Sequence, residues 1–168
     1  MSADTPKPTA LSKIVIETRP HAEQRYPTSG DWGAGYATKP RATYSETGDC
    51  LIVTVSEMGD WRIEALVAVH ELIEALLCKS DGVSEKAVCD FDVEFEAARD
   101  EAVGHREDVT WFGFRGRPVD ADAEPGDDPD APYARQHTFA TAVERMLCAA
   151  LGVKWNDYEV TEAALYGR

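Results

Sequence analysis

The sequence predicts an α+β domain in which a small antiparallel sheet, built from the N-terminal half, packs on about three main helices. Short runs rich in β-branched residues come first, between residues 13 and 55, and turn formers separate them. Longer segments with apolar residues three and four positions apart follow from residue 61 onward. Strands that come first and helices that follow are typical of α+β folds rather than of alternating α/β folds.

Three strands are expected in the N-terminal half. The segment 51–55, Leu-Ile-Val-Thr-Val, has the strongest strand pattern, and 13–18 and 42–45 are the other two candidates. The stretch between Pro20 and Pro40 is rich in glycine and proline. Because these residues favour turns, that stretch is predicted to be a long loop.

The first two helices are expected directly after the strands. Asp60 is a suitable N-cap for a helix that continues to about residue 80 and ends before Gly82. Ser84 is the N-cap expected for the next helix. The segment 88–96 fits both a helix and an alternating strand, and the cap together with its Glu, Ala and Arg content favours the helix.

The C-terminal half is harder to assign. The third helix is expected from the end of an acidic loop, 120–132, to about Leu151. Residues 102–118 have no clear pattern, and 110–114 is either a short strand or an apolar flap.

Composition narrows the class of protein. A chain of 168 residues with 43% hydrophobic residues fits one soluble domain at 12–168, after a polar tail at 1–11 that is expected to be disordered. A formal charge of −14 argues against a nucleic-acid backbone or an anionic membrane as partner. No membrane-spanning run or signal peptide is evident, so a cytoplasmic protein is expected. The four cysteines form no Cys-x-x-Cys pair and are expected to be reduced.

The first helix carries ionisable residues on an apolar face. One helical line, three and four positions apart, consists of Ile63, Val67, His70, Glu74 and Leu77. An ionisable pair on such a core-facing line costs several kcal/mol unless it has partners, so it usually has a function or a compensating contact. Four positions apart, His70 and Glu74 lie roughly 5–6 Å from each other and can hold one ion.

The last helix has the same feature. Its corresponding line consists of His137, Thr141, Glu144, Cys148 and Leu151. Packed against each other, the two helices would bring His70 and Glu74 close to His137 and Glu144. Histidine and carboxylate ligands are typical of zinc and similar divalent ions, so these four residues are the predicted metal ligands. The alternative is purely structural, with His70 and Glu74 as a buried ion pair and Glu144 paired with an arginine.

Further residues are predicted around this metal site. Glu71 points about 100° away from its neighbour on the helix and would be the general base. Asp92 is a candidate extra ligand or a partner that orients a histidine. The loop with His21, Arg25 and Tyr26 could close over the site, with His21 as another ligand and Arg25 binding an anionic substrate group. The alternative for this loop is an ordinary connector.

Two resemblances add to these predictions. The segment 70–74, His-Glu-Leu-Ile-Glu, resembles the His-Glu-x-x-His helix of zinc metallopeptidases, the zincins, with Glu74 in place of the second histidine. The resemblance implies a zincin-like fold, His70 as a zinc ligand, Glu71 as the base, and a third ligand from a later helix. Because a carboxylate is a harder ligand than imidazole, Glu74 also makes manganese, iron or magnesium credible.

The second resemblance covers more of the chain. The segments 20–32, 70–75 and 125–129, the last followed by Tyr133 and His137, are together similar to an uncharacterised bacteriophage and prophage protein family. This resemblance implies a phage-encoded protein in the cytoplasm of a bacterial host, and it implies no activity.

The function predicted from these observations is a phage-encoded, metal-dependent hydrolase that uses a metal-activated water. Zinc is the first choice of ion, with manganese or iron as alternatives. The substrate is a peptide or a nucleotide or other small phosphorylated molecule. The rival hypothesis is a non-enzymatic acidic protein that binds and inhibits a host protein, for which the charge of −14 is the main argument.

Overall fold

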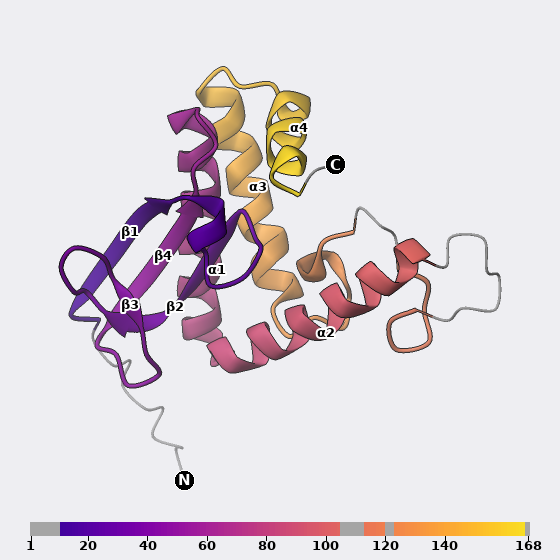
Figure 1. Ribbon diagram of the computed structural model, residues 1–168, viewed down its shortest axis with the longest axis horizontal. Helices are drawn as coiled ribbons and strands as arrows, with labels where there is room; N and C mark the ends of the chain where they lie inside the picture. Colours follow the sequence, from indigo (N-terminus) through magenta and orange to yellow (C-terminus); the bar gives the residue numbers. More distant parts are fainter. Residues whose placement is uncertain (1–10, 105–112, 120–122, 167–168) are drawn as a thin grey trace, which may run out of the picture.

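The computed structural model describes residues 11–104, 113–119 and 123–166, and it confirms the α+β class. Its four strands are β1 (Lys13–Arg19), β2 (Gly30–Tyr36), β3 (Thr43–Tyr44) and β4 (Cys50–Ser56). They form one curled sheet in the order β1-β4-β2-β3 (Figure 1). The sheet is mixed rather than wholly antiparallel, because β1 pairs parallel with β4 while β2 pairs antiparallel with both β4 and β3.

The strand β2 lies inside the stretch predicted to be a loop, so that part of the prediction is wrong. Glycine is depleted in strands, and β2 contains three glycines in seven residues. The glycines fit because neighbouring side chains come very close to the backbone there. A Cβ added at Gly30 would overlap Val67 and Glu71 of the first helix, and one at Gly35 would overlap Ile52 of β4. Such close approach is a recognised reason for glycine within a strand.

The expected helices are present, together with a fourth. They are α1 (Trp61–Asp81), α2 (Glu85–Gly104), α3 (Ala134–Ala150) and α4 (Trp155–Leu165). Short 3-10 helices η1 (His21–Glu23) and η2 (Pro125–Asp127) lie in the connections. The ambiguous segment 88–96 is helical, as predicted. The fourth helix, of eleven residues, is not among the elements that the sequence predicts.

The caps of α1 and α2 are the ones that the sequence predicted. The Asp60 side chain accepts a hydrogen bond from the Arg62 amide at 2.9 Å, and Gly82 ends α1 with φ 76°. The Ser84 hydroxyl accepts from the Ala87 amide at 3.2 Å at the start of α2. These contacts fix where α1 begins and ends, and therefore which side of α1 carries His70.

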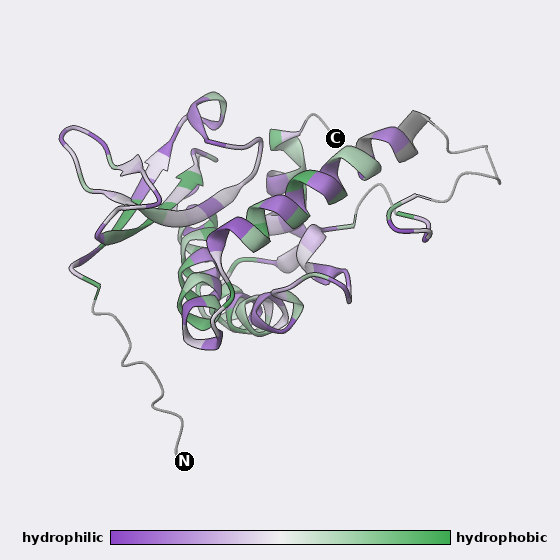
Figure 2. Ribbon diagram, turned by 90° about the horizontal axis from the view of Figure 1, so that it is seen from below, coloured by the Kyte–Doolittle hydropathy of each residue, from purple (hydrophilic) through white to green (hydrophobic). Residues whose placement is uncertain are grey.

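The main core lies between one face of the sheet and α1. Helix α1 packs across β2 and β4 and along α3 over most of its length (Figure 1). Figure 2 shows both hydrophilic and hydrophobic residues along α2, whose buried Phe91 and Phe95 pack against Phe114. Phe114 thus packs one part of the segment 102–118, which has no clear sequence pattern, against α2. Residues 105–112 of that segment lie outside the described part of the chain. No helix within the described residues is both long and apolar enough to span a bilayer.

Candidate metal centre

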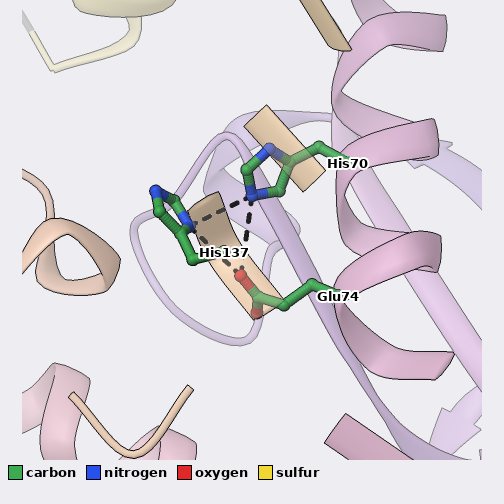
Figure 3. Close-up of side chains that lie close together, drawn as sticks. All are labelled: His70, Glu74 and His137. Atoms are coloured by element: carbon green, nitrogen blue, oxygen red, sulfur yellow. Dashed lines mark hydrogen bonds and ion pairs between the residues drawn. The ribbon is translucent and has the colours of Figure 1, made fainter. Parts of the chain in front are cut away.

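Three of the predicted ligands meet at one point between α1 and α3 (Figure 3). Nε2 of His70 and Nδ1 of His137 are 3.2 Å apart. Oε2 of Glu74 lies 3.2 Å from Nδ1 of His137 and 3.6 Å from Nε2 of His70. His70 and Glu74 come from successive turns of α1, and His137 faces them from the first turn of α3. The convergence predicted from the two helical lines is therefore present in the fold.

The size of this triangle fits a divalent ion. With metal–ligand bonds of about 2.0–2.2 Å, the ligand atoms of a tetrahedral site lie about 3.3–3.6 Å apart. The three observed separations of 3.2, 3.2 and 3.6 Å are close to that range. Two imidazoles and a carboxylate are a common ligand set for zinc, and they leave a fourth position for water or substrate.

The outer nitrogen of His70 is held by a carboxylate. Nδ1 of His70 lies 3.1 Å from Oε2 of Glu144, whose other oxygen accepts a hydrogen bond from the Tyr158 hydroxyl at 2.5 Å. Glu144 is almost fully buried, with 3% of its surface exposed. A proton on Nδ1 pointing at Glu144 leaves the lone pair of Nε2 directed into the triangle. Glu144 thus lies behind His70 instead of completing the ligand set, which differs from its predicted role.

His137 has a matching arrangement on its other side. Its Nε2 lies 3.5 Å from a Glu124 oxygen and 3.6 Å from an Asp127 oxygen. Glu124 directly precedes the short helix η2, and Asp127 is its last residue. This helix packs so closely that a Cβ added at Gly126 would overlap the His137 ring. A proton on Nε2 facing these acids leaves the lone pair of Nδ1 directed into the triangle. Glycine at 126 is what allows η2 to approach this ring.

The third ligand is anchored by β2. The Trp32 indole N–H donates to Oε1 of Glu74 at 2.9 Å, which leaves Oε2 for the two histidines. Trp32 is itself buried in the core between β2 and α1. Because a buried indole N–H needs an acceptor, this bond orients the Glu74 carboxylate and satisfies the tryptophan together.

Glu71 directly follows His70 on α1. Within the described residues its half-buried carboxylate makes no hydrogen bond or ion pair, and its side chain lies against the backbone of Gly30. Burial, and then the negative charge of Glu74, raises the pKa of Glu71 well above its ordinary value. A carboxyl group that has no partner among the described residues, and that senses the charges of Glu74, His70 and His137, is a candidate to exchange a proton with a bound molecule.

The pKa values of the three ligand residues show how strongly the site attracts positive charge. Burial alone would lower the pKa of His137, but hydrogen bonds that its ring donates to Glu124 and Glu74 raise it to about 9. His70 is likewise raised well above its ordinary pKa, against the effect of burial, by Glu144 and Glu74. For Glu74, burial is outweighed by the two histidines, which lower its pKa to about 2. In the protein without an ion, protons on the histidines supply the positive charge.

Protons are a poor substitute for a metal ion in this geometry. If each histidine carries one proton on its outer nitrogen, two lone pairs face each other at 3.2 Å. If both histidines are doubly protonated, two cationic rings face each other at the same distance. A single proton between the inner nitrogens of His70 and His137 relieves this repulsion. A divalent cation, by contrast, satisfies both nitrogens and Glu74 together.

Other predicted residues lie outside the triangle. Asp92 accepts a hydrogen bond from the Tyr133 hydroxyl at 2.5 Å, and the Tyr133 ring packs edge-on against His137 with ring centres 6.1 Å apart. Burial raises the pKa of Asp92 to about 7. Within the described residues Asp92 therefore contacts a tyrosine that packs on a histidine, and neither of the histidines of the triangle.

The predicted substrate loop has a structural role in this fold. The Arg25 guanidinium donates two hydrogen bonds to Asp31 and one to Glu85, and it stacks over Tyr44 and Tyr26. An arginine with two acidic partners is poorly available for an anionic substrate.

His21 also has its contacts outside the candidate metal site. Its Nδ1 lies 2.9 Å from the Ser56 hydroxyl, and its ring packs edge-on against Tyr166. These contacts favour the alternative prediction for the loop that carries His21, which is a connector rather than a segment that closes over the site.

Several residues of the site were not predicted. Trp32 lies in the stretch predicted to be a loop, and Glu124 and Asp127 lie in the acidic loop 120–132, for which no role at the site is predicted. No role is predicted for Tyr158 either. A periodic pattern identifies residues that share a face of one helix, but it carries no information about residues that approach that face from elsewhere. The only available signal was chemical, since a buried tryptophan or tyrosine needs a hydrogen-bond partner.

Comparison of the chain with protein-family models, with curated proteins and with solved structures returns no match. The resemblances to the zincin helix and to a phage protein family therefore stay predictions, and the functional argument depends on the geometry of the site.

Proposed function

We propose that this protein is a metal-dependent hydrolase in which His70, Glu74 and His137 hold a divalent ion, with zinc as the first choice. The observation that carries the proposal is the orientation of the two histidines. Each has its outer nitrogen in front of a carboxylate, and the inner nitrogens converge with Glu74 at separations of 3.2–3.6 Å. Carboxylates behind metal-bound histidines are typical of zinc sites, where they fix the ring and increase its basicity.

An ion in this position supplies a Lewis acid that polarises water or a substrate oxygen. The residues of the chain provide the rest of the chemistry. Trp32 and Glu144 hold the Glu74 and His70 side chains in place. Glu71 has a carboxyl group with no other partner among the described residues. The charge of a bound cation would lower its raised pKa, and the carboxylate would then accept a proton from the attacking water. With three ligands from the protein, one position is left where water and substrate can bind.

Substitution of the proposed base tests this function. Purified protein loaded with zinc or manganese would be assayed with internally quenched peptides and with bis(4-nitrophenyl) phosphate, which represent the two predicted substrate classes. Glu71→Gln is expected to keep the ion and to lose about 100-fold or more of the hydrolysis rate, because it cannot accept the proton. The matched control is Glu57→Gln, an exposed carboxylate outside the site, which is expected to retain the rate.

Two outcomes contradict the proposal. Hydrolysis that is equally fast in wild type and Glu71→Gln would exclude Glu71 as the base. Hydrolysis that persists after complete removal of the ion would exclude the metal site as its source.

A further inference from the structure

The outer edge of β1 is a long strand edge that nothing in the described chain covers. β1 is the first strand in the sheet order and has β4 as its one neighbour (Figure 1). It extends over seven residues, Lys13–Arg19, four of which are Ile, Val or Thr. Exposed edges of this length and composition readily pair with another strand, and natural proteins usually protect them.

Two isoleucines are exposed on this strand. Ile14 and Ile16 are 44% and 49% exposed, although their register partners Leu51 and Val53 in β4 are buried. The reason lies in the packing of the helical layer. Ile14 and Ile16 share the sheet face that α1 covers, but α1 packs across β2 and β4 and does not extend over β1 to the same degree. The outer edge of β1 therefore has backbone N–H and C=O groups without a partner strand, next to apolar side chains that are exposed.

The hydrogen-bonding groups of β1 indicate a register for a partner strand. The Glu57 amide donates to the Arg19 carbonyl at the end of the β1–β4 pairing. Because successive residues of a strand direct their N–H and C=O groups to opposite sides, Lys13, Val15 and Glu17 direct theirs toward β4, as Arg19 does. Ile14, Ile16 and Thr18 therefore present theirs to the outer edge. Ala42 packs on the other sheet face of β1, where it contacts the side chains of Glu17 and Arg19.

We propose that β1 pairs antiparallel with the β1 strand of a second copy of this chain, about a two-fold axis at Val15. In this register Val15 lies opposite its own counterpart as a non-hydrogen-bonded pair, and the outward-directed backbone groups of Ile14 face those of the partner subunit's Ile16. Ile14 lies opposite the partner subunit's Ile16, so four exposed isoleucines meet on one face. Lys13 lies opposite the partner subunit's Glu17, which places opposite charges together.

Neighbouring registers are less favourable. A two-fold axis at Ile16 would place Lys13 opposite the partner subunit's Arg19, so that like charges face each other. The Val15 register is therefore the one in which the apolar and the charged groups of the strand both match. The result is a continuous eight-stranded sheet, which leaves the two metal centres on separate protomers.

Solution mass tests the interface. Sedimentation velocity is run over a wide concentration range, in enough salt to screen the net charge of −14. Wild type is expected to shift from 18.5 kDa to twice that mass as its concentration rises. Ile16→Lys is expected to stay monomeric at every concentration, because it places two cations in the centre of the isoleucine cluster. Circular dichroism checks that each variant is folded, and Ile14→Lys replaces Ile16→Lys if the latter is not.

Met146→Lys is the matched control. Met146 is 74% exposed on α3, so the change removes an exposed apolar side chain of similar size elsewhere on the molecule. This variant is expected to dimerise like wild type. A wild type that is monomeric throughout overturns the proposal. So does a dimer that survives Ile16→Lys or is lost in Met146→Lys.

A cross-linking experiment tests the register. Ile14→Cys and Ile16→Cys chains, mixed and oxidised, are expected to form a disulfide-linked heterodimer, while each variant alone stays unlinked like wild type. Equally efficient cross-linking of Ile16→Cys with itself would contradict the axis at Val15.

Discussion

At the scale of single residues, the two histidines of the site each have two different environments. His70 has Glu144 at one nitrogen and the ligand triangle at the other, and His137 has Glu124 and Asp127 at one nitrogen and the triangle at the other. In each case the outer carboxylates decide which nitrogen carries the proton. The geometry therefore fixes the orientation of both rings before any ion binds, and an ion would replace the protons on the inner nitrogens.

This arrangement predicts that Glu144 affects metal affinity without being a ligand. Glu144→Gln keeps an acceptor for the His70 N–H and for the Tyr158 hydroxyl, but it removes the negative charge behind His70. The affinity for zinc is expected to fall about tenfold or more, with about one ion still bound per chain at saturation. Competition against a fluorescent chelator measures the affinity.

Glu159→Gln, an exposed carboxylate on α4, is the control and is expected to bind zinc like wild type. Complete loss of the ion in Glu144→Gln would instead make Glu144 a direct ligand. Unchanged affinity would mean that the contact with His70 does not influence the site.

Part of the site was predictable at this scale, for a physical reason. His70, Glu74 and His137 occupy positions where the helical pattern calls for apolar residues, and burying such groups without partners is expensive. Their departure from the pattern is visible in the sequence. Trp32 and Glu124 break no pattern in their own segments, so only the fold reveals that they contact Glu74 and His137.

At the scale of elements, α4 closes one side of the site. It supplies Tyr158 to Glu144, and its Glu162 accepts a hydrogen bond from the Ser29 hydroxyl next to β2. Burial, and then the nearby charge of Glu124, raises the pKa of Glu162 from 4.5 to about 7. Because the folded protein binds this proton more tightly than the unfolded chain does, Glu162 makes the fold less stable as the pH rises from about 4.5 to about 7.

Glu162→Gln should remove this pH dependence while keeping the acceptor for Ser29. In metal-free protein, its free energy of unfolding is expected to equal that of wild type near pH 4.5 and to exceed it by about 2 kcal/mol at pH 8. Urea denaturation at the two pH values measures the difference. Glu159→Gln should show no such growth with pH, and an equal difference for Glu162→Gln at both pH values would show that Glu162 titrates normally.

The elements that the sequence failed to predict share a cause. Strand β2 contains glycines that are unfavourable in an isolated strand, and it is stabilised by pairing with β4 and β3 and by close contact with α1. Helix α4 is short, and its buried Tyr158 is held by contacts with Glu144 of α3. Local pattern predicts α1 and β4 well because their own residues determine them, whereas β2 and α4 depend on tertiary contacts.

At the scale of the whole molecule, the candidate metal centre lies where several elements of the fold meet. The three proposed ligands and their partners come from α1, α3, β2, α4 and η2, so an ion in the triangle would connect the sheet to these helices. An ion that binds the folded chain and not the unfolded chain adds its binding free energy to stability.

Removal of the ion should therefore lower the melting temperature. With free zinc at about 100 times its dissociation constant, the ion contributes about 2.7 kcal/mol, which corresponds to a shift of about 5–10 °C for a chain of this size. Differential scanning calorimetry with and without a chelator measures the shift. His70→Ala should show no response to the chelator, and a wild type that shows none either would mean that the site contributes nothing to stability.

The net charge of −14 remains the main argument for the rival hypothesis of an acidic inhibitor of a host protein. That hypothesis needs no ion and treats the histidine and glutamate contacts as a means of holding α1 and α3 in register. Metal content separates the two hypotheses directly.

The most direct test is elemental analysis of protein purified without a histidine tag, comparing wild type with His70→Ala and His137→Ala. His21→Ala is the matched control, because His21 contacts Ser56 and lies outside the triangle. About one transition-metal ion per chain in wild type and His21→Ala, and none in the other two variants, is the predicted result. Wild-type protein that carries no ion and takes up neither zinc nor manganese when they are added would contradict the metal centre.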